Sequence, residues 1–217
     1  MMFTRFPVYA VAFLSLAALL PGAAQAEGLY LKALGGLSSL QDASAQRQGV
    51  ISTQGSYKSG FAAGSAVGYG LTPNFSTELE FLVRKSKLDK FDAAQLGTSG
   101  DYASVIVSLN ALYTFDGWST GANSRYRPFV GFGLGLVDET DFDVKGGTAP
   151  QEYEAFSELA WQARAGVDWE VNKDWSLTAE LRYLDAGTPS LEAQRSGPDL
   201  KAGYSTVDLL VGVTYRF

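Results

Sequence analysis

Cysteine and histidine are both absent from this chain of 217 residues, and each absence excludes a group of functions. Without cysteine there can be no disulfide, no catalytic thiol and no cysteine-based zinc or iron-sulfur site. Without histidine, the nucleophilic triads that use a histidine base and the usual zinc hydrolases are excluded as well. We therefore expect neither a metal site nor another cofactor.

The chain also lacks an excess of basic residues and, after its first 26 residues, any long apolar run. Lys and Arg number 17 against 23 Asp and Glu, a net charge of −6. This balance argues against nucleic acid as a partner, because phosphate binding needs a basic face. Since no later stretch approaches the ~18 consecutive apolar residues of a membrane-spanning helix, any membrane crossing must use strands.

The N-terminal residues have the pattern of a secretory signal peptide. Arg5 supplies a positive charge, residues 8–20 form a short apolar stretch, and the small-residue motif Ala24-Gln25-Ala26 follows. The apolar stretch is shorter than the ~20 residues of a membrane anchor. The pattern predicts cleavage after Ala26, with residues 1–26 as signal peptide and residues 27–217 as one domain.

Beyond residue 26, apolar and polar residues alternate with the period of two that is typical of strands. The last segment is the clearest, since Val207, Leu209 and Val211 alternate with polar or small residues. Eight strands are predicted near residues 29–39, 57–71, 75–87, 102–115, 126–137, 156–171, 175–186 and 204–217.

Short and long connections alternate between these strands. Residues 72–74, 116–125 and 172–174 form the short ones, and residues 41–56, 88–101, 138–155 and 187–203 form four longer segments rich in Gly, Ser, Gln and Asp. This layout is typical of an antiparallel up-and-down β-barrel, with turns at one end and four loops at the other.

Alternation alone does not distinguish a membrane barrel from a soluble, lipocalin-like one, but the placement of charge does. Of the eight lysines, only Lys32 lies well inside a predicted strand. Arginines and carboxylates occupy the polar rows, as expected of a confined interior in which charges are paired, and aromatic residues gather at the ends of the apolar rows. We therefore predict an all-β, eight-stranded transmembrane barrel.

The strongest candidate site is a set of charged residues on the inward rows, namely Glu78, Glu80, Arg164, Glu180 and Arg182. They could gate a narrow pore, or they could form a paired polar core. We favour the core, because eight strands leave little open bore. Rows of glycine on the second and fifth predicted strands are expected to leave room for arginines from opposite strands, Arg164 among them.

A second candidate lies in the predicted loop at 138–155. Asp141, Asp143 and Glu152 nearly reproduce the spacing of an EF-hand calcium loop, but Lys145 occupies a ligand position and no helices flank the segment. We favour a solvated acidic loop over a calcium site.

Three segments carry a resemblance to a known family: RPFVGFGLG at 127–135, ELRY at 180–183 and VGVTYRF at 211–217. The chain after residue 26 resembles the small outer-membrane β-barrels of Gram-negative bacteria, of the OmpA-barrel, opacity-protein and "porin family" type. The last segment is similar to the C-terminal signal that the outer-membrane assembly machinery recognises, with Val213, Tyr215 and Phe217 as its residues.

The resemblance implies a place in the Gram-negative outer membrane, in contact with lipid and lipopolysaccharide. The short turns and termini would be periplasmic and the long loops extracellular. The leading hypothesis is a non-enzymatic, monomeric protein whose barrel is an anchor and whose loops have a structural, adhesive or antigenic role, with an extracellular ligand as partner. The alternative is a channel for ions or small solutes, gated by the lumen Glu/Arg pairs. Outer-membrane enzymes of similar architecture all use histidine, which is absent here.

Overall fold

The fold is known from a computed structural model. It describes residues 28–40, 43–47, 52–91, 99–121, 124–145, 151–155, 158–187, 190–193, 200–202 and 204–217. Within these ranges, no helix is long and apolar enough to cross a membrane.

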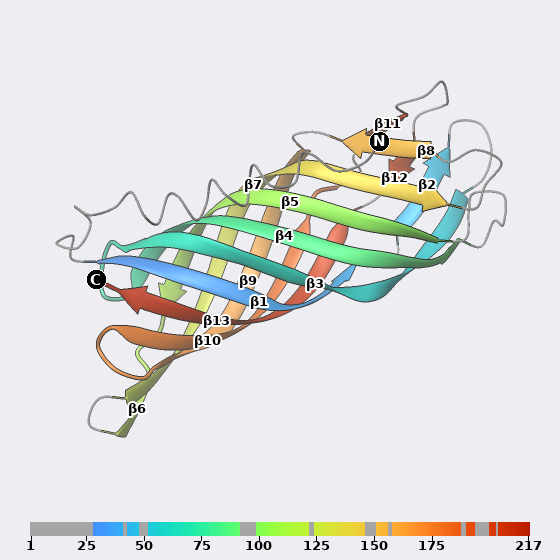
Figure 1. The fold of residues 1–217 in the computed structure, drawn as a ribbon. Helices are drawn as coiled ribbons and strands as arrows, with labels where there is room; N and C mark the ends of the chain where they lie inside the picture. The colour runs from blue at the N-terminus through green and yellow to red at the C-terminus, as the bar shows by residue number, and fades with distance from the viewer. Residues whose placement is uncertain are drawn as a thin grey trace.

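Eight long strands form a closed barrel (Figure 1). They are β1 (Leu29–Leu40), β3 (Ser52–Gly70), β4 (Phe75–Phe91), β5 (Ser99–Thr114), β7 (Ser124–Lys145), β9 (Glu158–Glu170), β10 (Trp175–Asp185) and β13 (Ser205–Arg216). Successive members pair antiparallel, and β1 pairs with both β3 and β13. Closure gives each of these strands two neighbours, which a sheet in lipid requires. The predicted eight-stranded up-and-down barrel is confirmed.

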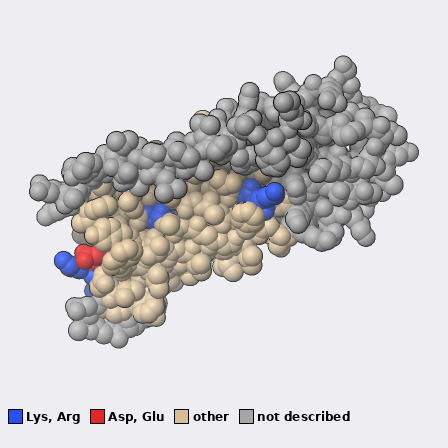
Figure 2. Space-filling model, in the orientation of Figure 1, with Lys and Arg blue, Asp and Glu red and all other residues tan. Residues whose placement is uncertain are grey.

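The barrel wall has its polar side inside and its apolar side outside. In β10, buried and exposed residues alternate strictly. Leu181 is 55% exposed, whereas Arg182 next to it is 0% exposed. In Figure 2, most of the visible wall is uncharged; Lys and Arg atoms show at two places on it, and no Asp or Glu atoms show between its two ends. This arrangement, opposite to that of a water-soluble barrel, suits a wall surrounded by lipid.

Aromatic side chains form belts near both ends of the apolar wall. At the turn end, the rings of Trp175 and Tyr215 lie 4.8 Å apart, and toward the loop end the rings of Trp161 and Tyr183 lie 5.4 Å apart. Trp175 and Tyr183 are eight residues apart on β10. At ~3.3 Å per residue and a tilt of ~40°, the belts are separated by ~20 Å, close to the ~25 Å apolar band of transmembrane barrels.

The wall continues beyond the barrel at the loop end, within segments that were predicted only as loops. Four short strands, β2 (Ala43–Arg47), β8 (Gln151–Ala155), β11 (Ser190–Ala193) and β12 (Leu200–Ala202), lie within the predicted loops. They pair in the order β8-β11-β12-β2, and β2 and β8 also pair with the extended ends of β3 and β7. Together with β3, β4, β5 and β7, these short strands close a second ring, which we call the loop-end ring. In residues 141–145, charged and apolar residues alternate, which indicates a strand. The Gly and Asp content of the surrounding segment favours a loop and obscured this signal.

A small extension also occurs at the turn end. The predicted turn at 116–125 contains β6 (Trp118–Gly121), which pairs with the start of β7. Trp118 contacts Tyr126 of β7, with ring centroids 5.9 Å apart. The hairpin thereby extends the aromatic belt on that side.

Candidate functional site

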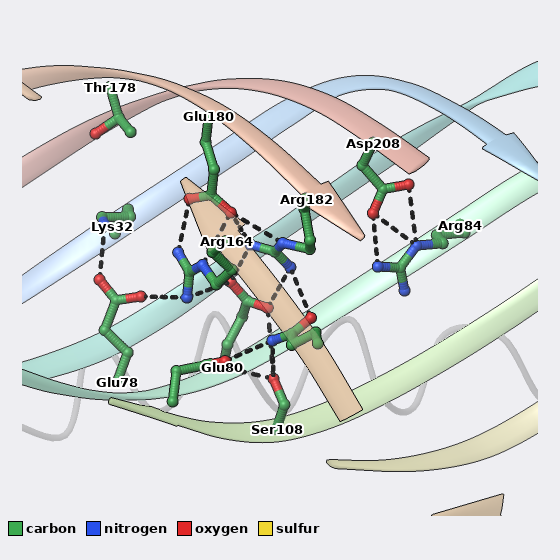
Figure 3. A network of polar contacts seen from close by, with 12 residues as sticks. Lys32, Glu78, Glu80, Arg84, Ser108, Arg164, Thr178, Glu180, Arg182 and Asp208 are labelled. Atoms are coloured by element: carbon green, nitrogen blue, oxygen red, sulfur yellow. Dashed lines mark hydrogen bonds and ion pairs between the residues drawn. The ribbon is translucent and has the colours of Figure 1, made fainter. Parts of the chain in front are cut away.

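Six charged side chains from four strands meet in the barrel interior (Figure 3). Alternate positions project to one face of a strand, which brings two pairs of residues inward together. The six are Lys32 of β1, Glu78 and Glu80 of β4, Arg164 of β9, and Glu180 and Arg182 of β10. Each is at most 5% exposed. All five residues of the predicted charge cluster are here, with Lys32 as the sixth; we call these residues the central network.

Arg164 of β9 forms ion pairs with carboxylates on two other strands, β4 and β10. Its Nη1 lies 2.8 Å from Oε2 of Glu78 on β4. Its Nε and Nη2 donate to the two carboxylate oxygens of Glu180, at 2.9 and 2.7 Å. This two-point geometry is the strong form of an Arg-carboxylate pair. One guanidinium group therefore fixes the relative positions of β4, β9 and β10.

Arg182 makes the complementary connection. Its Nη1 and Nη2 donate to the two oxygens of Glu80 at 2.6 and 2.8 Å, and Nη2 also donates to Glu180 at 2.7 Å. Glu180 thus accepts from both arginines. Buried charges persist only when they are paired and hydrogen-bonded, and this condition is met.

Lys32 completes the charge balance of the central network. Its Nζ lies 2.6 Å from Oε1 of Glu78 and 5.9 and 5.6 Å from the ring centroids of Tyr30 and Phe129. Tyr30 donates to the same Glu78 oxygen at 3.0 Å. Three cations now face three carboxylates, so the network is neutral as a whole.

Further polar contacts fill the interior on the loop side of the central network. Gln162 donates to Asn110 at 2.5 Å and to Ser108 at 3.0 Å. Nearer the loops, Nη2 of Arg84 lies 2.7 Å from Asp208, which also accepts from Ser38 at 2.6 Å.

The glycine rows make room in the interior. The sequence predicted that Arg164 would fill this room, but other side chains lie closest to the glycines. A Cβ atom at Gly68 would collide with the ring of Tyr30, and one at Gly133 with the side chain of Asn110. The spaces are therefore filled by residues of adjacent strands. In a closed barrel of eight strands, near neighbours are large enough to occupy them.

The family model "Outer membrane protein beta-barrel domain" matches residues 9–217. The chain belongs to this family. It is therefore an outer-membrane β-barrel protein of the Gram-negative type.

Several relatives of this chain are named Outer membrane protein W. The protein from Vibrio cholerae is 28% identical over 142 residues, which cover 64% of this chain and 64% of the relative. The protein from Salmonella typhimurium is 32% identical over 97 residues, which cover 42% and 44%. The matched region thus spans 44% to 64% of the length of these relatives.

Solved structures show the same fold at low sequence identity. Neisserial surface protein A has a TM-score of 0.57 and 19% identity, with 88% of this chain and 98% of that chain covered. OprG from Pseudomonas aeruginosa has a TM-score of 0.59 and 14% identity, with 88% and 97% covered. The likeness concerns the barrel architecture.

Val213 and Tyr215 of the predicted assembly signal lie on the outward row of β13, and Phe217 follows directly after the end of this strand. The Tyr215 and Phe217 rings are 5.1 Å apart, and Val213 is exposed on the same row. Their recognition by the assembly machinery stays a prediction. Ala24 and Ala26 of the predicted cleavage site lie outside the described residues.

The candidate calcium loop has a backbone unlike that of an EF-hand. Residues 141–145 belong to β7 and pair with β8, Asp141 opposite Glu154 and Asp143 opposite Glu152. An EF-hand loop instead wraps around its ion. Among the described residues, no group of three or more Asp or Glu side chains is placed to hold a metal ion.

Sequence reasoning left three charged residues out of the candidate site: Lys32, Arg84 and Asp208. Each was visible as a charge on an inward row of a predicted strand. Their partners were not, because Arg84 and Asp208 are 124 residues apart in sequence and meet only after the barrel closes.

Proposed function

We propose that this protein is a non-enzymatic outer-membrane anchor. Its closed barrel holds the protein in the bilayer, and the loop-end ring with its connecting loops presents a surface outside the cell. In this orientation, the short turns face the periplasm. The protein acts as a monomer, with lipid and lipopolysaccharide around its wall and an extracellular ligand at its loops.

One observation carries the proposal: the central network fills the interior with paired, buried charges. Glu78, Glu80 and Arg182 are each 0% exposed. A water-filled, charge-lined channel would leave such groups exposed to solvent. Their short contacts favour a structural core over a conducting bore.

The same contacts argue against catalysis by the interior carboxylates. Glu78 contacts Lys32 and Arg164, and Glu180 contacts both arginines of the network. A general acid or base needs a site open to substrate. Carboxylates that are paired with cations in this way are typical of structural ion pairs.

Planar-bilayer recordings of the purified protein test the proposal. We expect little or no steady conductance. Large and steady conductance would instead favour the alternative function, a channel for ions or small solutes whose gate is the central network.

The proposed role of the loops needs a separate experiment. We suggest whole-cell binding screens that compare the intact protein with a variant in which residues 146–150 and 194–199 are replaced by short Gly-Ser links. The intact protein and the loop variant should reach the outer membrane in equal amounts, and only cells with the intact protein should bind the extracellular ligand. Equal binding would place the ligand surface elsewhere.

A further inference from the structure

The barrel contains a cavity of about 280 Å³ at its turn end. Its lining extends from the β3–β4 turn, with Pro73 and Asn74, to Lys32 and Glu78 of the central network. It is therefore a pocket that ends blindly at the network. Its volume is below the ~300 Å³ at which pockets for drug-sized ligands begin, so an occupant must be small.

The inner wall of this cavity carries a carboxylate that forms no direct ion pair among the described residues. Asp168 of β9 lines the cavity and accepts a hydrogen bond of 2.6 Å from the Thr178 hydroxyl. No ion pair of the described residues includes Asp168. Lys32 is near enough to interact with it electrostatically, but the Nζ atom of Lys32 is paired with Glu78 at 2.6 Å. This carboxylate is placed to attract an ammonium group.

The rim of the cavity has the opposite character. Arg127 of β7 and Arg216 of β13 both line it and share one carboxylate, Glu170, at 3.5 and 3.8 Å. These distances to Glu170 are long compared with the ~2.7–2.9 Å of a good charge-assisted hydrogen bond. Arg127 also donates to the Pro73 carbonyl at 2.8 Å, and Arg216 donates to the Ser176 hydroxyl. Lys173, 89% exposed, adds a third cation to the lining. The rim is placed to attract an anionic group.

We propose that this cavity binds a small zwitterionic solute. Its ammonium group lies against Asp168, and its phosphate or carboxylate group lies between Arg127 and Arg216. The lining side chains are on the inner side of the wall, so a free solute from the turn side reaches them more directly than a bilayer lipid does. The inference is independent of the proposed anchoring function, because it concerns the opposite end of the barrel from the loop-end ring.

The test uses phosphoethanolamine as probe, with inorganic phosphate and ethanolamine as its two halves. Binding to the full-length protein is measured by calorimetry in alkyl maltoside micelles, which carry neither charged group. We expect saturable binding of phosphoethanolamine and at least tenfold weaker binding of either half. Asp168→Asn and Arg216→Gln should each weaken it by roughly tenfold, as for a lost charge-assisted contact.

Arg125→Gln is the matched control, because Arg125 lies two residues from Arg127 on the same strand but does not line the cavity. Its affinity should equal that of the unchanged protein, and thermal unfolding of all variants checks that they fold. Absence of saturable binding would overturn the proposal. So would phosphate binding as tightly as phosphoethanolamine with no effect of Asp168→Asn, which would indicate a simple anion site.

A second arm separates a free solute from a lipid headgroup. The titration is repeated in nanodiscs that contain phosphatidylethanolamine and in nanodiscs that contain phosphatidylglycerol alone. Equal binding of the free probe in both supports a solute site. Loss of binding only with phosphatidylethanolamine would contradict it and assign the cavity to the lipid.

Discussion

Removal of Arg182 should destabilise the barrel by an amount that the geometry of the central network predicts. In Arg182→Met, Glu180 keeps two short contacts with Arg164, at 2.7 and 2.9 Å. Glu80 keeps only Arg164 at 3.6 Å and Ser108 at 3.5 Å. Two cations then face three buried carboxylates. An uncompensated charge of this kind costs about 3–5 kcal/mol.

A second substitution should reverse most of this loss. Arg182→Met combined with Glu80→Leu leaves Lys32 and Arg164 facing Glu78 and Glu180, a neutral set. Replacing both partners of a buried pair with apolar groups is often neutral. The double variant should therefore be more stable than the single variant by at least about 2 kcal/mol, a coupling that a double-mutant cycle measures.

Urea unfolding in lipid vesicles, followed by tryptophan fluorescence, provides the free energies. Arg182→Ala, recorded in a planar bilayer, adds a test of the bore, because it removes side-chain volume as well as charge and should raise conductance. A loss below about 1 kcal/mol in Arg182→Met, or a double variant no more stable than the single one, would refute the reasoning from pairing.

Three further predictions test the wall and its assembly. Leu181→Arg should cost about 2–4 kcal/mol of stability, because it places a charge in the lipid. Thr178→Ser on the inward row should change stability by less than ~0.5 kcal/mol. An apolar membrane probe should label single cysteines introduced at positions 177, 179 and 181 and spare those at 178, 180 and 182; the opposite pattern would show that the two faces of the wall are reversed. Deletion of Phe217 should reduce outer-membrane insertion but leave signal cleavage after Ala26 intact, as fractionation with N-terminal sequencing would show. Gly68→Ala should destabilise the barrel by about 1–3 kcal/mol, since the added methyl group meets the Tyr30 ring, and unchanged urea unfolding would show that the ring can move aside.

The wall could be predicted from sequence because each strand reports its own two faces. In β10 the order of residues alone separates Leu177, Ala179 and Leu181 from Thr178 and Glu180, and the structure keeps that separation. Period two is a local property, so no knowledge of neighbouring strands is needed. The five candidate charges could be assigned to the interior by the same argument.

The pairing of those charges could not be predicted, since it depends on how the strands are staggered. Register shifts interrupt the pairing of β3 with β4 near Lys58 and of β5 with β7 near Val105. Each irregularity changes the height at which a side chain enters the interior. Arg84 meets Asp208, and Lys32 meets Glu78, across intervening strands that pair without a shift at those levels. Both contacts depend on the stagger of several strands, which no single strand specifies.

The central network also sets a limit on how often the bore can open. Any opening must separate at least one buried pair, such as Arg182 from Glu80, at a cost of about 3–5 kcal/mol. Since each 1.4 kcal/mol is a factor of about ten in an equilibrium, the open form would be about one molecule in 10² to 10⁴. Brief, rare openings are therefore compatible with an anchoring role, whereas steady conductance is not. The frequency of openings in single-molecule recordings should rise as the network is weakened, and a frequency that does not change with substitutions in the network would place the path of the ions elsewhere.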